Sequence, residues 1–276
     1  MGFGDWQPQS TARLSLPPGI AAVWWLDLTT VPEARWETWT TVLDHEEKAR
    51  AARFVRDSDR RQYIAAHALL RGMLSRHGGL APRCWRFVTG AHGKPSLHPD
   101  HGLDRLRFNL SHAPHAVACG LVLDHPIGVD IEDRARPGGH LQLADAYFAP
   151  AEVAQLRARP MAEQNTLFFL FWTLKEAYIK ATGAGLSTPL DQFAFDCRTI
   201  RIHFEPSLAD DDRAWHFHTL MPTTRHTLSI AIRHGGIGPL TILPRAVSHQ
   251  EIDRLTNTGD YDVNRQGRRQ SGETGA

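Results

Sequence analysis

Cysteine is scarce in this chain, and the few cysteines present are badly spaced for a metal cluster or a disulfide framework. Only Cys84, Cys119 and Cys197 occur in 276 residues, and no CxxC pair is found. A thiolate zinc site needs closely spaced pairs, and a disulfide-stapled domain needs a dense, even set. The pattern argues against both and is typical of a protein kept in the reducing cytoplasm.

Long apolar runs and an excess of one charge are missing as well. The apolar stretch at residues 20–28 carries Asp27 and is far shorter than a membrane span, and the N-terminus shows no signal-peptide pattern. Lys and Arg total 31 against 30 for Asp and Glu, so no global field for a nucleic acid is expected. We therefore expect a cytoplasmic protein that contacts neither membrane nor nucleic acid.

Apolar periodicity predicts a mixture of helices and short strands. The clearest helix is expected over residues 59–77, where apolar side chains recur at helical spacing until Gly78 and Gly79 end the run. Helices are expected at 31–55, 59–77, 140–158 and 161–182, and strands at 21–28, 85–88, 106–110, 116–123, 127–131, 192–204, 214–220 and 226–233.

The order of these elements predicts an α+β protein of two similar halves, because each half places a long helix before short strands. A single continuous domain is the alternative. The 42% of apolar residues suffices for a sizeable core. We divide the chain into an irregular arm (1–19), an N-terminal half (20–112), a C-terminal half with the candidate metal site (113–245) and a disordered polar tail (256–276).

The segment PIGVDIE at residues 126–132 places two carboxylates on one face of a strand. Val129 and Ile131 alternate with Asp130 and Glu132, so the apolar pair is expected to face a core and the acidic pair the opposite side. Like charges this close repel unless a cation or water relieves them, and paired oxygen donors suit Mg²⁺ beside phosphates. A strand with a solvated acidic face is the alternative.

A further carboxylate lies on a predicted helix, in FWTLKEAYIKA at residues 171–181. Trp172, Glu176 and Lys180 recur at i, i+4 and i+8 and so share one face, with Lys175 beside them. Glu176 suits a third metal ligand or a general base, and an ammonium group there would neutralise phosphate charge. A plain Glu176–Lys180 ion pair, worth about 0.3 kcal/mol, is the alternative.

Three other segments offer groups that bind phosphate, although a structural histidine, a plain loop and a solvated basic face explain them equally well. None matches a Walker loop, and no GxSxG elbow supports a Ser-His triad. The candidates are Ser111 and His112 in FNLSH, Lys94 and Pro95 in GAHGKP, and Arg50 and Arg53 in a basic run.

In this combination, FNLSH, PIGVDIE and FWTLKEAYIKATGAGLSTPLD resemble the 4′-phosphopantetheinyl transferases of the larger, Sfp-type class. The resemblance covers roughly residues 20–235 and implies two pseudo-symmetric α+β halves with the active site between them. It implies transfer of 4′-phosphopantetheine from coenzyme A to a serine of an apo acyl or peptidyl carrier protein, with release of adenosine 3′,5′-bisphosphate. Mg²⁺ is the implied cofactor, with Mn²⁺ as a substitute.

The resemblance also implies residue roles. Glu176, Lys180 and Asp130 would be catalytic, and Asp130, Glu132 and Glu176 would hold the metal. The implied coenzyme A contacts are Arg50, Arg53, Lys94, Pro95, Ser111, His112 and Lys180. One departure concerns the 3′-phosphate pocket, where Gln62 stands in place of an expected Arg and Arg61 is its neighbour.

Two other functions use the same residues. A metal-dependent phosphohydrolase would cleave coenzyme A or a related nucleotide without a carrier, and a non-catalytic binding protein would keep only the scaffold. The sequence does not identify the carrier, whether of fatty-acid, polyketide or nonribosomal-peptide synthesis. By analogy with the larger class, secondary-metabolite carriers are preferred. Two halves within one chain favour a monomer.

Overall fold

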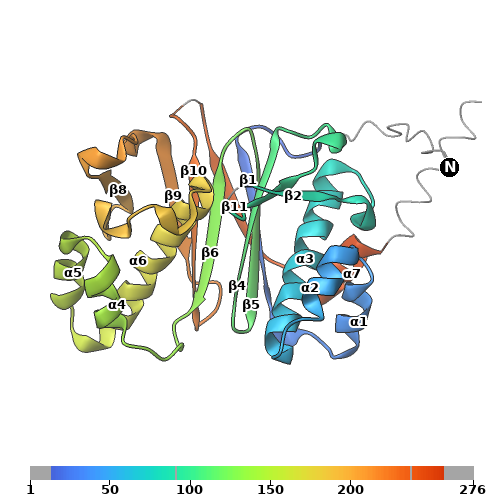
Figure 1. Cartoon of the computed structure of the whole chain (residues 1–276), viewed down its shortest axis with the longest axis horizontal. Helices are drawn as coiled ribbons and strands as arrows, with labels where there is room; N and C mark the ends of the chain where they lie inside the picture. The colour runs from blue at the N-terminus through green and yellow to red at the C-terminus, as the bar shows by residue number, and fades with distance from the viewer. Residues whose placement is uncertain (1–13, 91, 237, 258–276) are drawn as a thin grey trace, which may run out of the picture.

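Two sheets stand face to face in the centre of the molecule, with helices on both outer sides (Figure 1). The computed structural model describes residues 14–90, 92–236 and 238–257. Most of the arm expected at 1–19 and nearly all of the tail expected at 256–276 lie outside the described residues. The layers run helix, sheet, sheet, helix, which confirms the α+β class and the two-part build.

The first half is a four-stranded sheet with helices on one face. Its strand order is β11-β1-β5-β4, with β11 parallel to β1 and the other neighbours antiparallel. Helix α3 packs on this sheet, and α1, α2 and α7 pack on α3 (Figure 1). The bounds are β1 (Ile20–Asp27), α1 (Ala34–Thr40), α2 (His45–Ala51), α3 (Asp57–Gly78), β4 (Leu106–Ala113), β5 (Ala116–Leu123), β11 (Thr241–Ala246) and α7 (His249–Thr256), with a small hairpin of β2 (Phe87–Thr89) and β3 (Pro95–Leu97) beside β4.

The second half is a three-stranded antiparallel sheet of order β6-β10-β9, with α6 lying across β6 and β10. Helices α4 and α5 and the hairpin β7-β8 surround α6 on its outer side (Figure 1). The bounds are β6 (Ile127–Asp133), α4 (His140–Tyr147), α5 (Pro150–Arg157), α6 (Met161–Thr182), β7 (Phe193–Asp196), β8 (Arg201–Phe204), β9 (Trp215–Leu220) and β10 (His226–Arg233).

Burial on both faces accounts for the composition of the central strands. Every residue of β5, AVACGLVL, is buried, since helices cover one of its faces and the second sheet covers the other. In β6, the predicted alternation is confirmed. Val129 and Ile131 join the core between the sheets, and Asp130 contacts α6 on the opposite face.

The division between the halves differs from the expected one. A boundary at residues 112 and 113 separates β4 from β5, yet these strands are antiparallel neighbours in one sheet. The sheets instead separate between β5 and β6, and β11 and α7 return the chain to the first half. Local patterns name strands but not their partners, and the exposed edge strand β11, which contains Pro244, carries little strand signal.

Three expected elements are also divided. The helix expected over 140–158 is two helices, α4 and α5, with Pro150 as the first residue of α5. The helix expected over 31–55 breaks into α1 and α2 at Asp44, whose carboxylate accepts the Glu47 amide while the Glu47 carboxylate accepts the Asp44 amide. This reciprocal cap starts a new helix. The strand expected over 192–204 is the hairpin β7-β8. In the described part of the chain, every helix is too short or too polar to span a bilayer.

Gly128 allows α6 to lie directly against β6. A Cβ atom at this position would lie 1.9 Å from the Ala177 carbonyl oxygen and 2.5 Å from the Ala181 amide nitrogen, both on α6. Because these are backbone atoms, no side-chain rotation relieves the clash. We expect Gly128→Ala to lower the free energy of unfolding by about 3 kcal/mol, as overpacking does.

Urea unfolding of Gly128→Ala measures this cost. Gly90→Ala is the control, because its added Cβ would meet its nearest neighbour, the Lys94 carbonyl oxygen, at an ordinary 3.5 Å. An unfolding midpoint equal to that of the wild type in Gly128→Ala would contradict the close approach.

Candidate active site

Asp130 and Lys180 meet where β6 faces α6, and Ser111 joins them from β4. Lys180 Nζ donates to Asp130 Oδ1 at 2.5 Å and to Ser111 Oγ at 2.9 Å, and Ser111 Oγ donates to Asp130 Oδ1 at 3.1 Å. Asp130 is only 4% exposed, so this carboxylate does not belong to a solvated acidic face. Burial raises the pKa of its carboxyl group, and the Lys180 charge opposes that rise.

Glu132 and Glu176 share the electrostatic environment of this pair. Burial raises the pKa of both carboxyl groups, and the charge of Asp130 raises each further, whereas Lys180 lowers both. Arg136 approaches Glu132 at 3.6 Å without abolishing the shift. Three carboxylates that interact electrostatically, with one ammonium group that interacts with each of them, form a cluster that a further cation would stabilise.

The Glu132 carboxyl titrates in an unusual range, which predicts a pH dependence of stability. Burial and Asp130 raise its pKa from 4.5 to about 7. The folded state therefore binds more protons between these values, so the free energy of unfolding falls as pH rises from 4.5 to 7. We expect Glu132→Gln to be more stable than the wild type at pH 8, on the order of 2 kcal/mol, and equally stable at pH 4.

Urea unfolding at both pH values, with EDTA present, measures this difference. Glu163→Gln on α6 is the control, since Glu163 lies in an exposed pair with Arg159 and should change stability little at either pH. Equal stability of Glu132→Gln and the wild type at pH 8 would contradict the raised pKa.

The chemistry of these residues fits a divalent cation. Asp130 Oδ2 is buried and has no hydrogen-bond partner, whereas Oδ1 is bound by Ser111 and Lys180. Such an oxygen is costly unless another group binds it, and three carboxylates are the all-oxygen donors that Mg²⁺ takes. Among the residues described, no group of three His, Cys, Asp or Glu side chains is already arranged as a metal site. The fit is therefore one of donor chemistry and shared charge.

Lys175 does not join this face of α6. Its side chain is 1% exposed, forms a 2.7 Å ion pair with the buried Glu152 on α5, and donates to the carbonyl oxygens of Leu190 and Phe193. The expectation that Lys175 lies beside Glu176 and Lys180 is wrong, because one residue along a helix turns the side chain by about 100°. The sequence did not single out Glu152, since a lone Glu in a short helical segment has no distinctive pattern.

Lys94 ties the hairpin turn of the first half to the second half. Its Nζ donates to the carbonyl oxygens of Ile127 on β6 and Ala181 on α6, at 3.2 and 2.9 Å. Burial and the charge of Arg107 lower the pKa of Lys94 to about 8. Pro95 follows as the first residue of β3. Two of the three N–H groups of the ammonium are thus used within the protein.

His112 follows Ser111 on β4 and lies within electrostatic reach of the Asp130–Lys180 pair. Partial removal from water and the Lys180 charge lower the pKa of its imidazole, and His67 on α3 contributes in the same direction. His67 is itself largely removed from water, which lowers its pKa to about 4. A line of charged and aromatic groups therefore leads from the carboxylates toward the first-half helices.

Arg50 and Arg53 lie at the far end of this line. Arg50 lies over the ring of Tyr63 at 5.6 Å, and Tyr63 stacks on His67 with ring centroids 3.9 Å apart. Together with Arg53, Arg50 lines an open groove of about 830 Å³ along α2. In the described residues neither arginine forms an ion pair, so both remain available to an anion.

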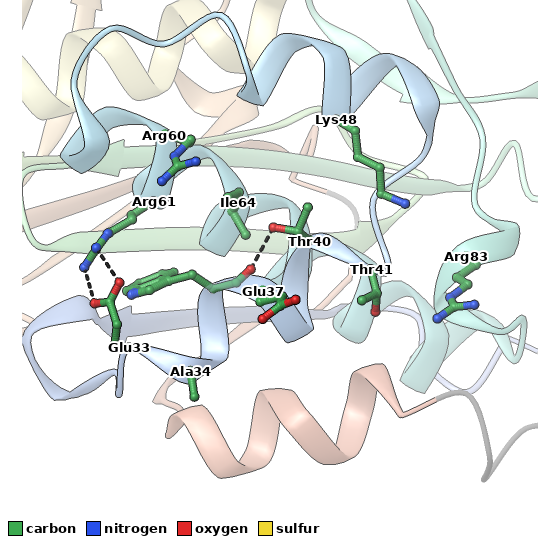
Figure 2. Close-up of a pocket in the computed structure, with 11 residues that line it drawn as sticks. Glu33, Ala34, Glu37, Thr40, Thr41, Lys48, Arg60, Arg61, Ile64 and Arg83 are labelled. Atoms are coloured by element: carbon green, nitrogen blue, oxygen red, sulfur yellow. Dashed lines mark hydrogen bonds and ion pairs between the residues drawn. The ribbon is translucent and has the colours of Figure 1, made fainter.

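A separate cavity of about 800 Å³ opens between α1, α2 and α3 (Figure 2). Arg61 lines it and holds the Glu33 carboxylate with two hydrogen bonds of 2.7 and 2.6 Å. Gln62 is buried on α3. None of the three carboxylates lines this cavity, and neither do Arg50 and Arg53. Arg61 is thus committed to a different surface from Arg50 and Arg53.

Two family models match this chain, and the gap between their matches lies at the connection from β5 to β6, where the two sheets separate. A family model described as "4′-phosphopantetheinyl transferase superfamily" matches residues 126–231, from the start of β6 into β10. A second, described as "4′-phosphopantetheinyl transferase, N-terminal", matches residues 30–120. The two matches together take in every candidate site residue.

Whole proteins give the same result. The chain is 31% identical to the 4′-phosphopantetheinyl transferase HetI of Nostoc sp. over 235 residues, which are 85% of this chain and 96% of that relative. It is 34% identical to the 4′-phosphopantetheinyl transferase Sfp of Bacillus subtilis over 60% of this chain and 70% of Sfp. The L-aminoadipate-semialdehyde dehydrogenase-phosphopantetheinyl transferase of Homo sapiens is 25% identical over 80% of this chain and 78% of that protein.

Proposed function

The chain belongs to the 4′-phosphopantetheinyl transferase superfamily, and from this premise we propose that Asp130, Glu132 and Glu176 hold its Mg²⁺ and direct the transfer. The enzyme moves 4′-phosphopantetheine from coenzyme A to a serine of an apo acyl or peptidyl carrier protein. Adenosine 3′,5′-bisphosphate is the other product. The observation that carries the assignment is the buried Asp130 carboxylate, with Oδ1 bound to Lys180 and Oδ2 without a partner.

Glu176 is the proposed base. The carrier serine Oγ attacks the β-phosphate of coenzyme A, and the bond from that phosphorus to the bridging oxygen of the adenosine bisphosphate breaks. A serine hydroxyl is a weak nucleophile, so removal of its proton by Glu176, directly or through a water, helps the attack. The raised pKa of Glu176 makes its carboxylate a stronger base. Bound Mg²⁺ would neutralise charge on the pyrophosphate.

Lys180 is the proposed partner of the departing phosphate. Its ammonium group lies on the same face of α6 as Glu176 and is held by Asp130 and Ser111, which orients it without burying it completely. Charge appears on the leaving oxygen only as the bond breaks, so the ammonium acts mainly on the transition state.

We expect Lys180→Ala to lower kcat by about 10²–10³-fold while the KM for coenzyme A changes by less than about fivefold. Steady-state kinetics with a purified apo carrier measures both constants. Lys180→Arg, which keeps a cation, is expected to retain part of the activity. A rise in KM with unchanged kcat would assign Lys180 to substrate binding instead.

The remaining candidates are proposed to bind coenzyme A along the line from the carboxylates to the α2 groove. His112 and Lys94 would contact the pyrophosphate, because they adjoin Lys180 or the backbone of β6 and α6. Lys94 keeps one N–H group for this purpose. Ser111, whose hydroxyl is already bound to Asp130 and Lys180, would contribute to this part of the site by orienting Lys180. Arg50 and Arg53 would bind the 3′-phosphate, and Pro95 shapes the turn beside it. Arg61, held by Glu33, is left out of this pocket.

The proposal is tested by incubating the protein with coenzyme A, Mg²⁺ and an apo carrier, followed by mass spectrometry of the carrier. A gain of one phosphopantetheinyl group on the carrier serine supports it, and EDTA should abolish the gain. Loss of coenzyme A without a change in carrier mass would indicate a phosphohydrolase. A panel of fatty-acid, polyketide and nonribosomal-peptide carriers then ranks the acceptors, with secondary-metabolite carriers as the proposed best substrates.

A further inference from the structure

Strands β4 and β6 lie side by side at the junction of the two halves but belong to different sheets. β4 is the edge strand of the first sheet and β6 the edge strand of the second. They pack closely, and within the described residues no backbone ladder joins them. An edge strand presents alternate N–H groups outward, and buried N–H groups need acceptors. The acceptors for β6 must therefore come from side chains.

Asn109 and Ser111 supply these acceptors. Asn109 Oδ1 accepts the N–H of Val129 at 2.8 Å, and Ser111 Oγ accepts the N–H of Ile131 at 3.2 Å. The two side chains are two residues apart on β4, so they project from the same face. Their partners are likewise two residues apart on β6. Both Asn109 and Ser111 are buried, at 6% and 5% exposure.

The two hydrogen bonds bracket Asp130, which stands between Val129 and Ile131. Ser111 is fully used there, because its hydroxyl accepts from Ile131 and Lys180 and donates to Asp130. Among the described residues, Asn109 makes no hydrogen bond with Asp130, Glu132, Glu176 or Lys180, yet it accepts from the amide of Val129, which directly precedes Asp130. The position of Asp130 along the junction thus depends on both rungs.

We propose that Asn109 and Ser111 form a two-rung side-chain ladder that sets the position of β6 against the first half and so places Asp130 for the transfer. This makes Asn109 a positioning residue, and the proposal rests on the function proposed for Asp130. The same two hydrogen bonds fix β6 relative to β4 beside the carboxylates. A displacement of about 1 Å at such a centre can lower a rate about 100-fold.

The test replaces Asn109 by Leu, which removes the acceptor but keeps the bulk, and by Asp, which keeps an acceptor oxygen in place. Amide hydrogen exchange is measured at Val129 and Ile131, together with kcat and the KM for coenzyme A. We expect Asn109→Leu to speed exchange at Val129 at least tenfold, more than at Ile131. We expect it to lower kcat about 10–100-fold with KM within about twofold. Asn109→Asp should restore protection at Val129 and part of kcat.

A matched control separates positioning from general loss of stability. Ile252→Val, in the buried face of α7, is expected to lower stability modestly without affecting kcat. Unchanged exchange at Val129 in Asn109→Leu would overturn the ladder. Faster exchange with a wild-type kcat would overturn the positioning role. Full activity of Asp130→Asn would overturn the proposed function while leaving the exchange result standing.

Discussion

Asp130→Asn is expected to lower carrier modification by about 10³-fold or more while the protein stays folded. The amide keeps the oxygen that accepts from Lys180 and Ser111, so the hydrogen bonds at Oδ1 survive. What is lost is the negative charge, on which the proposed binding of the cation depends. Interactions of this kind contribute several kcal/mol to the transition state of a phosphoryl transfer. Glu176→Gln is expected to have a comparable effect by removing the base.

Mass spectrometry of the carrier measures the rate, and NMR titration gives an independent readout. Because the charge of Asp130 raises the pKa of Glu132, Asp130→Asn should lower that pKa even in the absence of substrate. Asp145→Asn is the control, since Asp145 belongs to an exposed pair with Arg157. Wild-type turnover of Asp130→Asn with Mg²⁺ would show that the carboxylates do not form the metal site.

Lys175→Met is expected to lower the free energy of unfolding by about 3–5 kcal/mol. The substitution leaves the carboxylate of Glu152 buried without its cation, although the amides of Ala149 and Phe195 still donate to it. It also frees the carbonyl oxygens of Leu190 and Phe193. A buried charge without its partner is more costly than an apolar pair of the same shape.

The double variant Glu152→Gln/Lys175→Met should recover part of this loss, because the glutamine side chain carries no charge and its single amide oxygen can still accept from one of the two backbone N–H groups, that of Ala149 or that of Phe195. A double-mutant cycle from urea unfolding gives the coupling between the two residues. Breaking the exposed Arg159–Glu163 pair on the N-terminal side of α6 is the comparison and should cost under about 1 kcal/mol. Additive losses for Glu152 and Lys175 would contradict the buried pair.

Lys175 and Lys180 show which side-chain positions on α6 could be predicted from the sequence alone and which could not. Helical spacing correctly placed Lys180 on the face of Glu176, because i and i+4 positions meet on any helix. The same pattern could not tell that Lys175 faces Glu152, which lies earlier in the chain on another helix. Only the packing of α5 against α6 supplies that partner.

The junction between β4 and β6 shows the same limit of prediction from the sequence for the strands. Alternation in β6 predicted which side chains face the core, and the structure confirms it for Val129 and Ile131. The role of Asn109 was not found, because an Asn within a strand-like run has no distinctive pattern. Its function depends on an amide 20 residues away, on a strand of another sheet.

By itself, the sequence determined the helices and strands of most of the chain, the faces on which Val129, Ile131 and Asp130 project from β6, and the donor chemistry of the three acidic residues. These properties follow from the covalent order and from the periods of the helix and the strand. The tertiary structure decided the partners: β5 with β1, β11 with β1, Lys175 with Glu152, and Asn109 with β6. The physical reason is that pairing and burial depend on residues brought together from distant parts of the chain, which local periodicity does not record.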